Sequence, residues 1–426
     1  MRSTKTFNDL VSQVQFELTQ RVLPFWLENG PDEKYGGFFT CFDPITAAQT
    51  RDLKFMWAQG RMLWALSELT DWAQSPAGSE AMQDSPVTPD DFPRQAEQLF
   101  HFLDRYSTAE NGRAYHLLSR DGAPLTLLQA GLDDNDELHP STFADCFLAM
   151  AFARFASVFG HRGANDRSEE LFRSIRDLLS GGRFRTHPYP SPPGTRSHGE
   201  FLISSLAAGE AIRGENPPPT AKEILRGSLA RLRQDFRSPD GLFRELSPPP
   251  AASQLGRYAN PGHTLETYGV LLDNRQAARD VGWSVDEILD GIERTVEQSW
   301  DETFGGLFAF LLRGTTPGED PWEHHTLNRT VQRDWSLKLW WPHVEAMYTC
   351  FAAALTSGRQ SLREWYETIH RYTMQTFPSG GKSEWIQIRS REGIPVRRVT
   401  GLPVKDGYHI TRSLLKILQT ASRQDP

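Results

Sequence analysis

The sequence is poor in cysteine and has no long apolar run, and each shortage excludes a class of protein. Cys41, Cys146 and Cys350 are the only cysteines in 426 residues, and each lies in apolar or aromatic sequence. This pattern suits buried free thiols in a reducing compartment and argues against a disulfide framework. The N-terminal residues lack the apolar core of a signal peptide, and no apolar run reaches membrane-spanning length. We therefore expect a cytoplasmic protein with no membrane partner.

Positive charge is also scarce and scattered, since the net charge is −8. A basic stripe for nucleic acid is absent from the sequence, so we expect no nucleic-acid partner. No phosphate loop of the Walker type and no dinucleotide fingerprint follows a plausible strand. His324 and His325 lack a spaced third metal ligand, so the simpler interpretation is that these two histidines lie in a solvent-exposed loop. We expect neither metal nor cofactor; the oligomeric state stays open, with a homodimer as one alternative.

A glycine soon followed by an aromatic residue returns six times along the chain. Counted from Gly37, Gly112, Gly182, Gly241, Gly306 and Gly381, the gaps are 75, 70, 59, 65 and 75 residues. Each gap has room for two helices and a loop. Such a period predicts a repeat architecture.

The intervals between these glycines carry apolar residues at helical spacing. Twelve segments show it: 7–26, 57–72, 96–106, 143–159, 171–179, 201–212, 224–236, 265–277, 285–300, 342–355, 362–377 and 411–418. Six helical hairpins that close on themselves predict an all-α fold, an (α/α)6 barrel with short strands or turns at one rim, formed by residues 1–426 as a single domain. An open helical solenoid would show the same period, because the closing contact cannot be seen in sequence.

The segment from Lys338 to Met347 combines two indoles, an imidazole and a carboxylate at a predicted helix start. Proline is best tolerated at the first helical position, so we expect the helix to begin at Pro342, with Trp340 and Trp341 just before it. Glu345 then lies in the first turn, where the helix dipole keeps a carboxylate ionised. Two indoles beside an ionised acid would suit a sugar-binding pocket. The alternative is that both tryptophans belong to the core.

A second helix start carries an imidazole and a carboxylate on one face. Asn260 is a natural N-cap and Pro261 a natural first residue, which places His263 and Glu266 three apart on the same face. The predicted helix start at 406–412 repeats this design with His409 and Arg412 three apart, and the start at 54–61 sets Trp57 and Arg61 four apart on one face. If the inner helices share a direction, all these first turns gather at one mouth.

Two histidines in equivalent positions of different repeats suggest a proton shuttle, in which one imidazole removes a proton and the other supplies one. Glu266 would orient His263 or raise its basicity, and Arg61 or Arg412 would stabilise negative charge forming on oxygen. The main rival is a glycoside hydrolase, because Glu266, Glu345 and Glu384 could include a catalytic carboxylate pair.

Five stretches together resemble the N-acylglucosamine 2-epimerase family, which also includes cellobiose 2-epimerases and aldose-ketose isomerases. They are residues 36–41, 57–61, 260–266, 338–347 and 408–412. The resemblance spans nearly the whole chain. It implies an (α/α)6 barrel and metal-independent proton transfer at the carbon next to a sugar carbonyl.

The resemblance also implies roles for single residues. The two catalytic histidines of the family match His263 and His409. The family's substrate-contacting positions match Arg61, Glu266, Trp340, Glu345 and Arg412, and His198 and Arg257 correspond to a further pocket histidine and arginine of some members. Trp57, Trp341 and Trp385 complete the expected substrate-binding set.

The expected function is the interconversion of N-acylglucosamine and N-acylmannosamine by two-histidine proton transfer at carbon 2 through an enediolate. Alternatives on the same scaffold are an aldose-ketose isomerase or a cellobiose or mannose 2-epimerase; more distant ones are a glycoside hydrolase and a non-catalytic sugar-binding module. The segment 314–334 is longer than the family pattern and is expected beside the pocket as a lid. The sequence leaves open which histidine is the base in which direction, and whether a nucleotide activates the protein.

Overall fold

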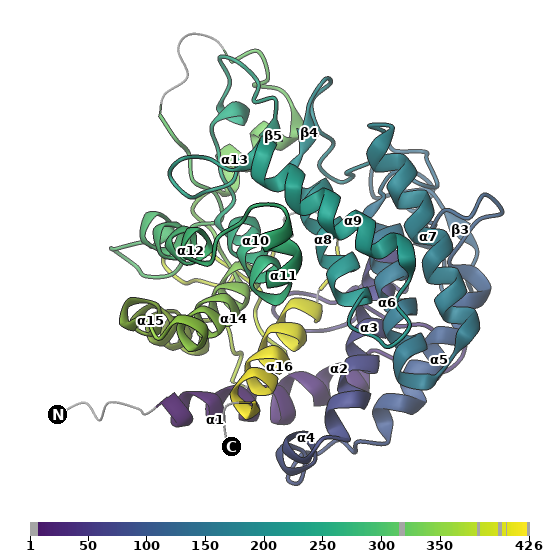
Figure 1. Cartoon of the computed structure of the whole chain (residues 1–426). Coiled ribbons are helices and arrows are strands. Elements are labelled where there is room, and N and C mark those ends of the chain that lie inside the picture. The colour runs from purple at the N-terminus through teal and green to yellow at the C-terminus, as the bar shows by residue number, and fades with distance from the viewer. Residues whose placement is uncertain (1–6, 315–319, 381–383, 399–402, 406, 424–426) are drawn as a thin grey trace.

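The computed structural model of the chain describes residues 7–314, 320–380, 384–398, 403–405 and 407–423. Three sequence features fall partly outside these ranges: residues 315–319 of the long segment, 381–383 of the sixth glycine-aromatic recurrence, and 406 before the helix of His409. Helices dominate the described chain (Figure 1). None of the helices searched among these residues combines the length and apolarity needed to cross a membrane.

Six helices line the centre of the described structure. They are α3 (Met56–Ala73), α6 (Phe143–Phe159), α8 (His198–Ala211), α10 (Pro261–Asp273), α14 (Trp340–Ser357) and α16 (Tyr408–Ser422). Each contacts the next in this order, and α16 contacts α3. The ring is therefore closed, which confirms the predicted barrel and shows that the open-solenoid alternative is wrong.

An outer layer of helices packs against this inner ring (Figure 1). It consists of α1 (Phe7–Glu17), α5 (Asp91–Tyr106), α7 (Arg162–Ser180), α9 (Pro219–Arg231), α12 (Val285–Ser299) and α15 (Gln360–Thr376). The sequence separates the two layers: α8 is buried at every position, whereas α7 buries one stripe and exposes a charged face. Amphipathic helices thus cover apolar ones, as an (α/α)6 barrel requires.

Shorter helices occupy the connections of the barrel. They are a π-helical turn at Leu18–Val22, α2 (Leu23–Asn29), α4 (Pro76–Ala81), a π-helical turn at Leu232–Phe236, a 3₁₀ turn at Gln254–Gly256, α11 (Arg275–Asp280) and α13 (Thr326–Asp334). The segment predicted as one helix over 265–277 is divided at Asn274, where α10 ends and α11 begins.

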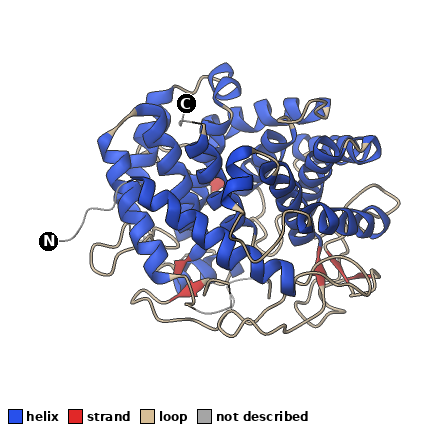
Figure 2. Ribbon diagram, turned by 90° about the horizontal axis from the view of Figure 1, so that it is seen from below, coloured by secondary structure: helices blue, strands red, loops and turns tan. Residues whose placement is uncertain are grey.

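The strands are short and antiparallel. β1 (Lys54–Phe55), β2 (Leu117–Leu118) and β3 (Pro124–Leu125) form one sheet, while β4 (Arg196–Ser197) pairs with β5 (Leu246–Ser247) and β6 (Lys338–Leu339) pairs with β7 (Ile388–Arg389). β1, β4 and β6 lead directly into inner helices. Most strands and long loops gather toward one end of the helices (Figure 2), which confirms the predicted rim.

The five glycine-aromatic recurrences that the structure describes in full are turns at this rim. Gly306 has a φ of 74°, and a Cβ there would lie 2.4 Å from the ring of Tyr372, so only glycine fits without displacing that ring. The turn is closed by an isolated bridge between Trp300 and Leu307. The first recurrence has the same design, with Gly37 at a φ of 78°.

The start of α14 differs from the prediction. The helix begins at Trp340 with Leu339 as N-cap, so both tryptophans are inside it and Pro342 is its third residue. The physical reason is that the N–H groups of the whole first turn lack intrahelical partners, so proline is tolerated at the third position as well as the first.

Candidate active site

A cavity of about 330 Å³ lies at the N-terminal ends of the inner helices. Each of these helices contributes a residue from its first turn: Trp57, Phe143, Gly199, His263, Trp341 and His409. The expectation that these helix starts gather at one mouth is confirmed. The positive ends of the helix dipoles therefore surround the cavity and favour negative charge inside it.

The outer part of the cavity wall comes from loops and from α13. Tyr189 and Tyr258 line it from two loops, and Leu327, Thr330 and Asp334 line it from α13. α13 belongs to the long segment 314–334, so its described part does lie beside the cavity, as the sequence predicted. Whether the segment acts as a lid stays a prediction.

His263 is fixed at the first turn of α10. The Asn260 side chain accepts a hydrogen bond from the His263 backbone N–H at 3.2 Å, and Pro261 occupies the first helical position, as predicted. Nδ1 of His263 lies 2.9 Å from Oε2 of Glu245. Burial by itself lowers the pKa of His263, but the charge and hydrogen bond of Glu245 outweigh it and leave the pKa raised. His263 is therefore suited to carry a proton near neutral pH.

His409 has a matching carboxylate on α14. Oε1 of Glu345 lies 2.8 Å from Nδ1 of His409, and Oε2 accepts a hydrogen bond from Arg412 at 2.9 Å. Burial favours the neutral acid, but Arg412 and His409 overcome it and lower the pKa of Glu345 to about 2. Glu345 is thus an ionised acceptor that orients the ring of His409.

Trp341 lies between the two histidines. α14 separates α10 from α16 in the inner ring, and the Trp341 ring is centred 5.4 Å from the His263 ring and 5.5 Å from the His409 ring. Trp341 is half-buried and lines the cavity, as does the buried Trp340. Trp341 therefore offers an aromatic surface with an imidazole at either side.

Glu266 is a buried acid at the cavity wall. It is 2% exposed, and among the described residues no hydrogen-bond donor reaches its Oε1. Burial raises the pKa of Glu266, and the nearby Glu345 carboxylate raises it further. An unsatisfied carboxyl oxygen at a cavity wall is a ready acceptor for a ligand hydroxyl.

Arg61 lies over aromatic rings on another side of the same cavity. Its guanidinium carbon is 4.0 Å from the ring centre of Phe147 and 4.7 Å from that of Trp57. Arg61 and Trp57 are thus neighbours, as their spacing predicted, and a buried guanidinium can stabilise a developing oxyanion.

Among the described residues, two groups of side chains each bring three possible metal-ligand atoms within 4.8 Å of one another: His198, Glu245 and His263, and Glu266, Glu345 and His409. In each group an imidazole and a carboxylate are already in hydrogen-bond contact, at 2.9 and 2.8 Å. Two ligands of a tetrahedral zinc ion with bonds of about 2.0 Å would be about 3.3 Å apart. The geometry therefore fits acid–base pairs better than a preformed zinc site.

A family model described as N-acylglucosamine 2-epimerase (GlcNAc 2-epimerase) matches residues 96–413, which is more than half of the chain. The chain belongs to the N-acylglucosamine 2-epimerase family. This match confirms the resemblance predicted from the five sequence stretches. It also confirms, at the level of the family, the prediction of a carbohydrate epimerase of the isomerase class.

Curated relatives and solved structures agree with this membership. N-acylglucosamine 2-epimerase of Mus musculus is 26% identical to this chain, and the match covers 94% of this chain and 89% of the mouse protein. N-acylglucosamine 2-epimerase of Homo sapiens is also 26% identical, and the match covers 92% of this chain and 86% of the human protein. A sugar epimerase from a ruminal bacterium superposes with a TM-score of 0.75 at 16% identity, over 96% of this chain and 99% of that chain. Cellobiose 2-epimerase from Bacillus thermoamylovorans B4167 superposes with a TM-score of 0.74 at 16% identity, over 97% of this chain and 100% of that chain. At these identities the structures show the shared fold.

Some residues of the expected substrate-binding set lie outside the described cavity lining. The indole N–H of Trp385 donates to Glu17 at 2.6 Å, and Trp385 is 1% exposed in the core. Arg257 is half-buried at the end of the 3₁₀ turn before Asn260, also outside the lining. Glu345 and Arg412 lie behind His409 and support it instead of forming the wall.

His198 is fully buried and also lies outside the lining. It contacts Glu245, the residue that sequence reasoning missed. Glu245 lies two residues after Phe243, the aromatic residue of the fourth glycine-aromatic recurrence, and this position is the only signal that could have pointed to it. Glu384, one of the acids of the hydrolase alternative, is paired with Lys405 at 3.0 Å and is absent from the described wall.

Proposed function

We propose that this member of the N-acylglucosamine 2-epimerase family interconverts N-acylglucosamine and N-acylmannosamine by moving the proton on carbon 2. The observation that carries the proposal is the pair His263 and His409. Both line one cavity, both hold Nδ1 against a buried carboxylate, and Trp341 lies between them. The printed names of the curated relatives support the choice of sugar.

The reaction uses the open-chain sugar, whose carbonyl makes the hydrogen on carbon 2 acidic. One histidine takes this proton, the bonding electrons form a double bond between carbons 1 and 2, and the carbonyl oxygen becomes an oxyanion. The other histidine, in its protonated form, returns a proton to the opposite face of carbon 2, and the carbonyl forms again. Solvent then restores the starting protonation of both rings.

The groups around the cavity would lower the energy of the intermediate. Arg61 and the N-termini of the inner helices favour the negative oxygen, because they are fixed positive charges and dipoles at a largely buried site. Glu266 would accept a hydrogen bond from a sugar hydroxyl. Trp341 would pack against the apolar face of the sugar.

The acylamino group also limits the outcome. When carbon 2 carries a hydroxyl, the same intermediate is an enediolate, and proton return to carbon 1 gives a ketose. When carbon 2 carries an acylamino group, return to carbon 1 would not give a ketose, so epimerisation is the productive route. An N-acylamino substrate therefore excludes the ketose product, whereas a 2-hydroxy sugar allows both epimerisation and isomerisation.

The test is to incubate the protein in heavy water with N-acetylglucosamine, N-acetylmannosamine, mannose, glucose and cellobiose separately, and to identify products by NMR. We expect both N-acetyl epimers, each with deuterium at carbon 2. Reaction of the 2-hydroxy sugars alone would contradict the proposed substrate. A free reducing sugar released from a glycoside without exchange would favour the hydrolase.

We also propose a cytoplasmic location. Cys41, Cys146 and Cys350 are buried and unpaired, and burial raises the pKa of the Cys41 thiol to about 12, so these cysteines fit a reducing compartment. A single catalytic domain and a homodimer stay predictions. Cell fractionation and light scattering would test the location and the oligomeric state.

A further inference from the structure

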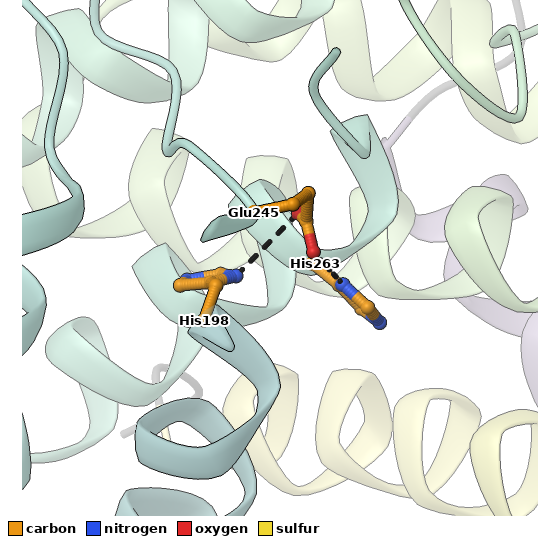
Figure 3. Close-up of side chains that lie close together, drawn as sticks. All are labelled: His198, Glu245 and His263. Atoms are coloured by element: carbon orange, nitrogen blue, oxygen red, sulfur yellow. Dashed lines mark hydrogen bonds and ion pairs between the residues drawn. The ribbon is translucent and has the colours of Figure 1, made fainter. Parts of the chain in front are cut away.

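A second imidazole lies directly behind the Glu245–His263 pair. Nδ1 of His198 is 3.6 Å from Oε1 of Glu245, while Oε2 of the same carboxylate contacts His263 at 2.9 Å. Figure 3 shows the Glu245 carboxylate between the two imidazoles, with the far nitrogen of His263 pointing away from it. His198 is fully buried and does not line the cavity, so it is not placed to touch a substrate.

Three contacts fix the position of the His198 ring. Its backbone N–H donates to the Glu245 carbonyl at 2.9 Å, which continues the β4–β5 ladder. Its ring stacks on Phe243 of the fourth glycine-aromatic recurrence, with centres 5.1 Å apart. Its Nε2 lies 3.0 Å from the hydroxyl of Thr267 on α10. The ring is therefore held from its backbone, from one face and from its far nitrogen.

The Thr267 contact has a consequence for the tautomer of His198. Burial lowers the pKa of His198 below its ordinary value, so the ring is neutral near pH 7 and has one N–H. Glu245 is ionised, because His263 and His198 overcome the effect of burial and lower its pKa to about 2. An ionised carboxylate can only accept, so the N–H belongs on Nδ1 and the Thr267 hydroxyl donates to Nε2.

We propose that His198 is a positioning residue, which directs its Nδ1–H at Oε1 of Glu245 and so keeps Oε2 aimed at His263. This inference rests on the proposed function, since His263 must be one of the two proton carriers. At 3.6 Å the contact of His198 with Oε1 is longer than a hydrogen bond, and no donor of the described residues comes within hydrogen-bond distance of the buried Oε1. His198 is the polar group that faces Oε1, and without it the carboxylate could turn away from His263. The series of contacts thus runs from Thr267 through His198 and Glu245 to His263, and only His263 contacts the sugar.

The experiment uses the two faces of carbon 2. In the variant His409→Ala, only His263 remains to remove and restore the carbon 2 proton, and in His263→Ala only His409 remains. Each single variant should exchange the carbon 2 hydrogen of one epimer with heavy water, as followed by NMR. His198→Leu is then added to each background, together with His198→Asn, whose amide can still donate from the position of Nδ1.

We expect His198→Leu to slow exchange about tenfold in the His409→Ala background and to leave it unchanged in the His263→Ala background, because outer partners of an active histidine matter only through that histidine. His198→Asn should recover most of the loss, and KM should stay close to that of the parent. Thr267→Val should give a smaller loss in the same background only.

Two sets of results would contradict the positioning role of His198 or the proposed function. Equal slowing in both backgrounds, or equal rates for His198→Leu and His198→Asn, would overturn the positioning role. If the wild-type protein itself exchanges no carbon 2 hydrogen, the proposed function fails, and not this inference alone. Circular dichroism checks the fold of each variant. If His198→Leu does not fold, Thr267→Val carries the comparison, and an unchanged exchange rate for Thr267→Val in the His409→Ala background would reject the proposal.

Discussion

Gly262 lies directly under Trp341: a Cβ added to Gly262 would be 2.5 Å from carbon atoms of the indole ring. The two residues belong to neighbouring inner helices, α10 and α14. Because only a hydrogen occupies position 262, the indole can lie between His263 and His409. The glycine of the Asn-Pro-Gly-His stretch is therefore required by packing and not by backbone conformation.

The substitution Gly262→Ala should push the Trp341 ring out of place. We expect kcat/KM to fall about ten- to a hundredfold, because misplacement of a positioning group by about 1 Å can cost this much. Global stability should change little, since alanine favours a helix by about 1 kcal/mol over glycine. Steady-state kinetics provide the measurement. The control is Gly227→Ala on α9, where an added Cβ meets nothing within 4 Å.

The two histidines should each be needed for turnover. His263→Ala and His409→Ala should reduce kcat by at least about a hundredfold, the usual contribution of one acid–base group. Both side chains lie at the cavity, so circular dichroism and thermal unfolding should stay near wild type. The matched control is His101→Ala, which changes an exposed histidine of α5. Near-normal rates in both folded variants would show that the two-histidine mechanism is wrong.

Glu245 should set the pH dependence of His263. In Glu245→Gln the charge that raises the pKa of His263 is lost, while the burial that lowers it remains. The pKa of His263 should therefore fall, and the rate that needs protonated His263 should decline at lower pH than in the wild type. NMR titration of the His263 ring and pH–rate profiles measure the shift. Glu17→Gln, a buried acid of α1 bonded to Trp385, should leave this titration unchanged.

Replacement of Trp341 and of Trp385 by phenylalanine should have different effects. Trp341→Phe should raise KM, because a smaller ring offers less surface to the sugar. Trp385→Phe removes the hydrogen bond to the buried Glu17, so it should lower the free energy of unfolding by about 1–3 kcal/mol and leave KM unchanged. Denaturant unfolding and kinetics on both variants test this. A raised KM in Trp385→Phe would instead support the prediction from the sequence that Trp385 contacts the substrate.

The helix starts show how much local sequence rules determine. The Asn260 cap, Pro261 at the first helical position and His263 in the first turn were all predicted, because capping acts within three or four residues. The position of Trp340 inside α14 was not, because the whole first turn tolerates proline and the sequence does not say which residue begins it.

The sequence by itself determined the repeat, the helices and the imidazoles at helix starts, because these follow from periods and caps read over short stretches. Only the tertiary structure decided that α16 meets α3 and closes the ring. It also decided that Glu245 pairs with His263, that His198 lies behind them, and that Trp341 and not Trp385 faces the cavity. The physical reason is that these contacts join residues far apart in the chain, and the rotation of each helix in the closed ring fixes which side chains meet.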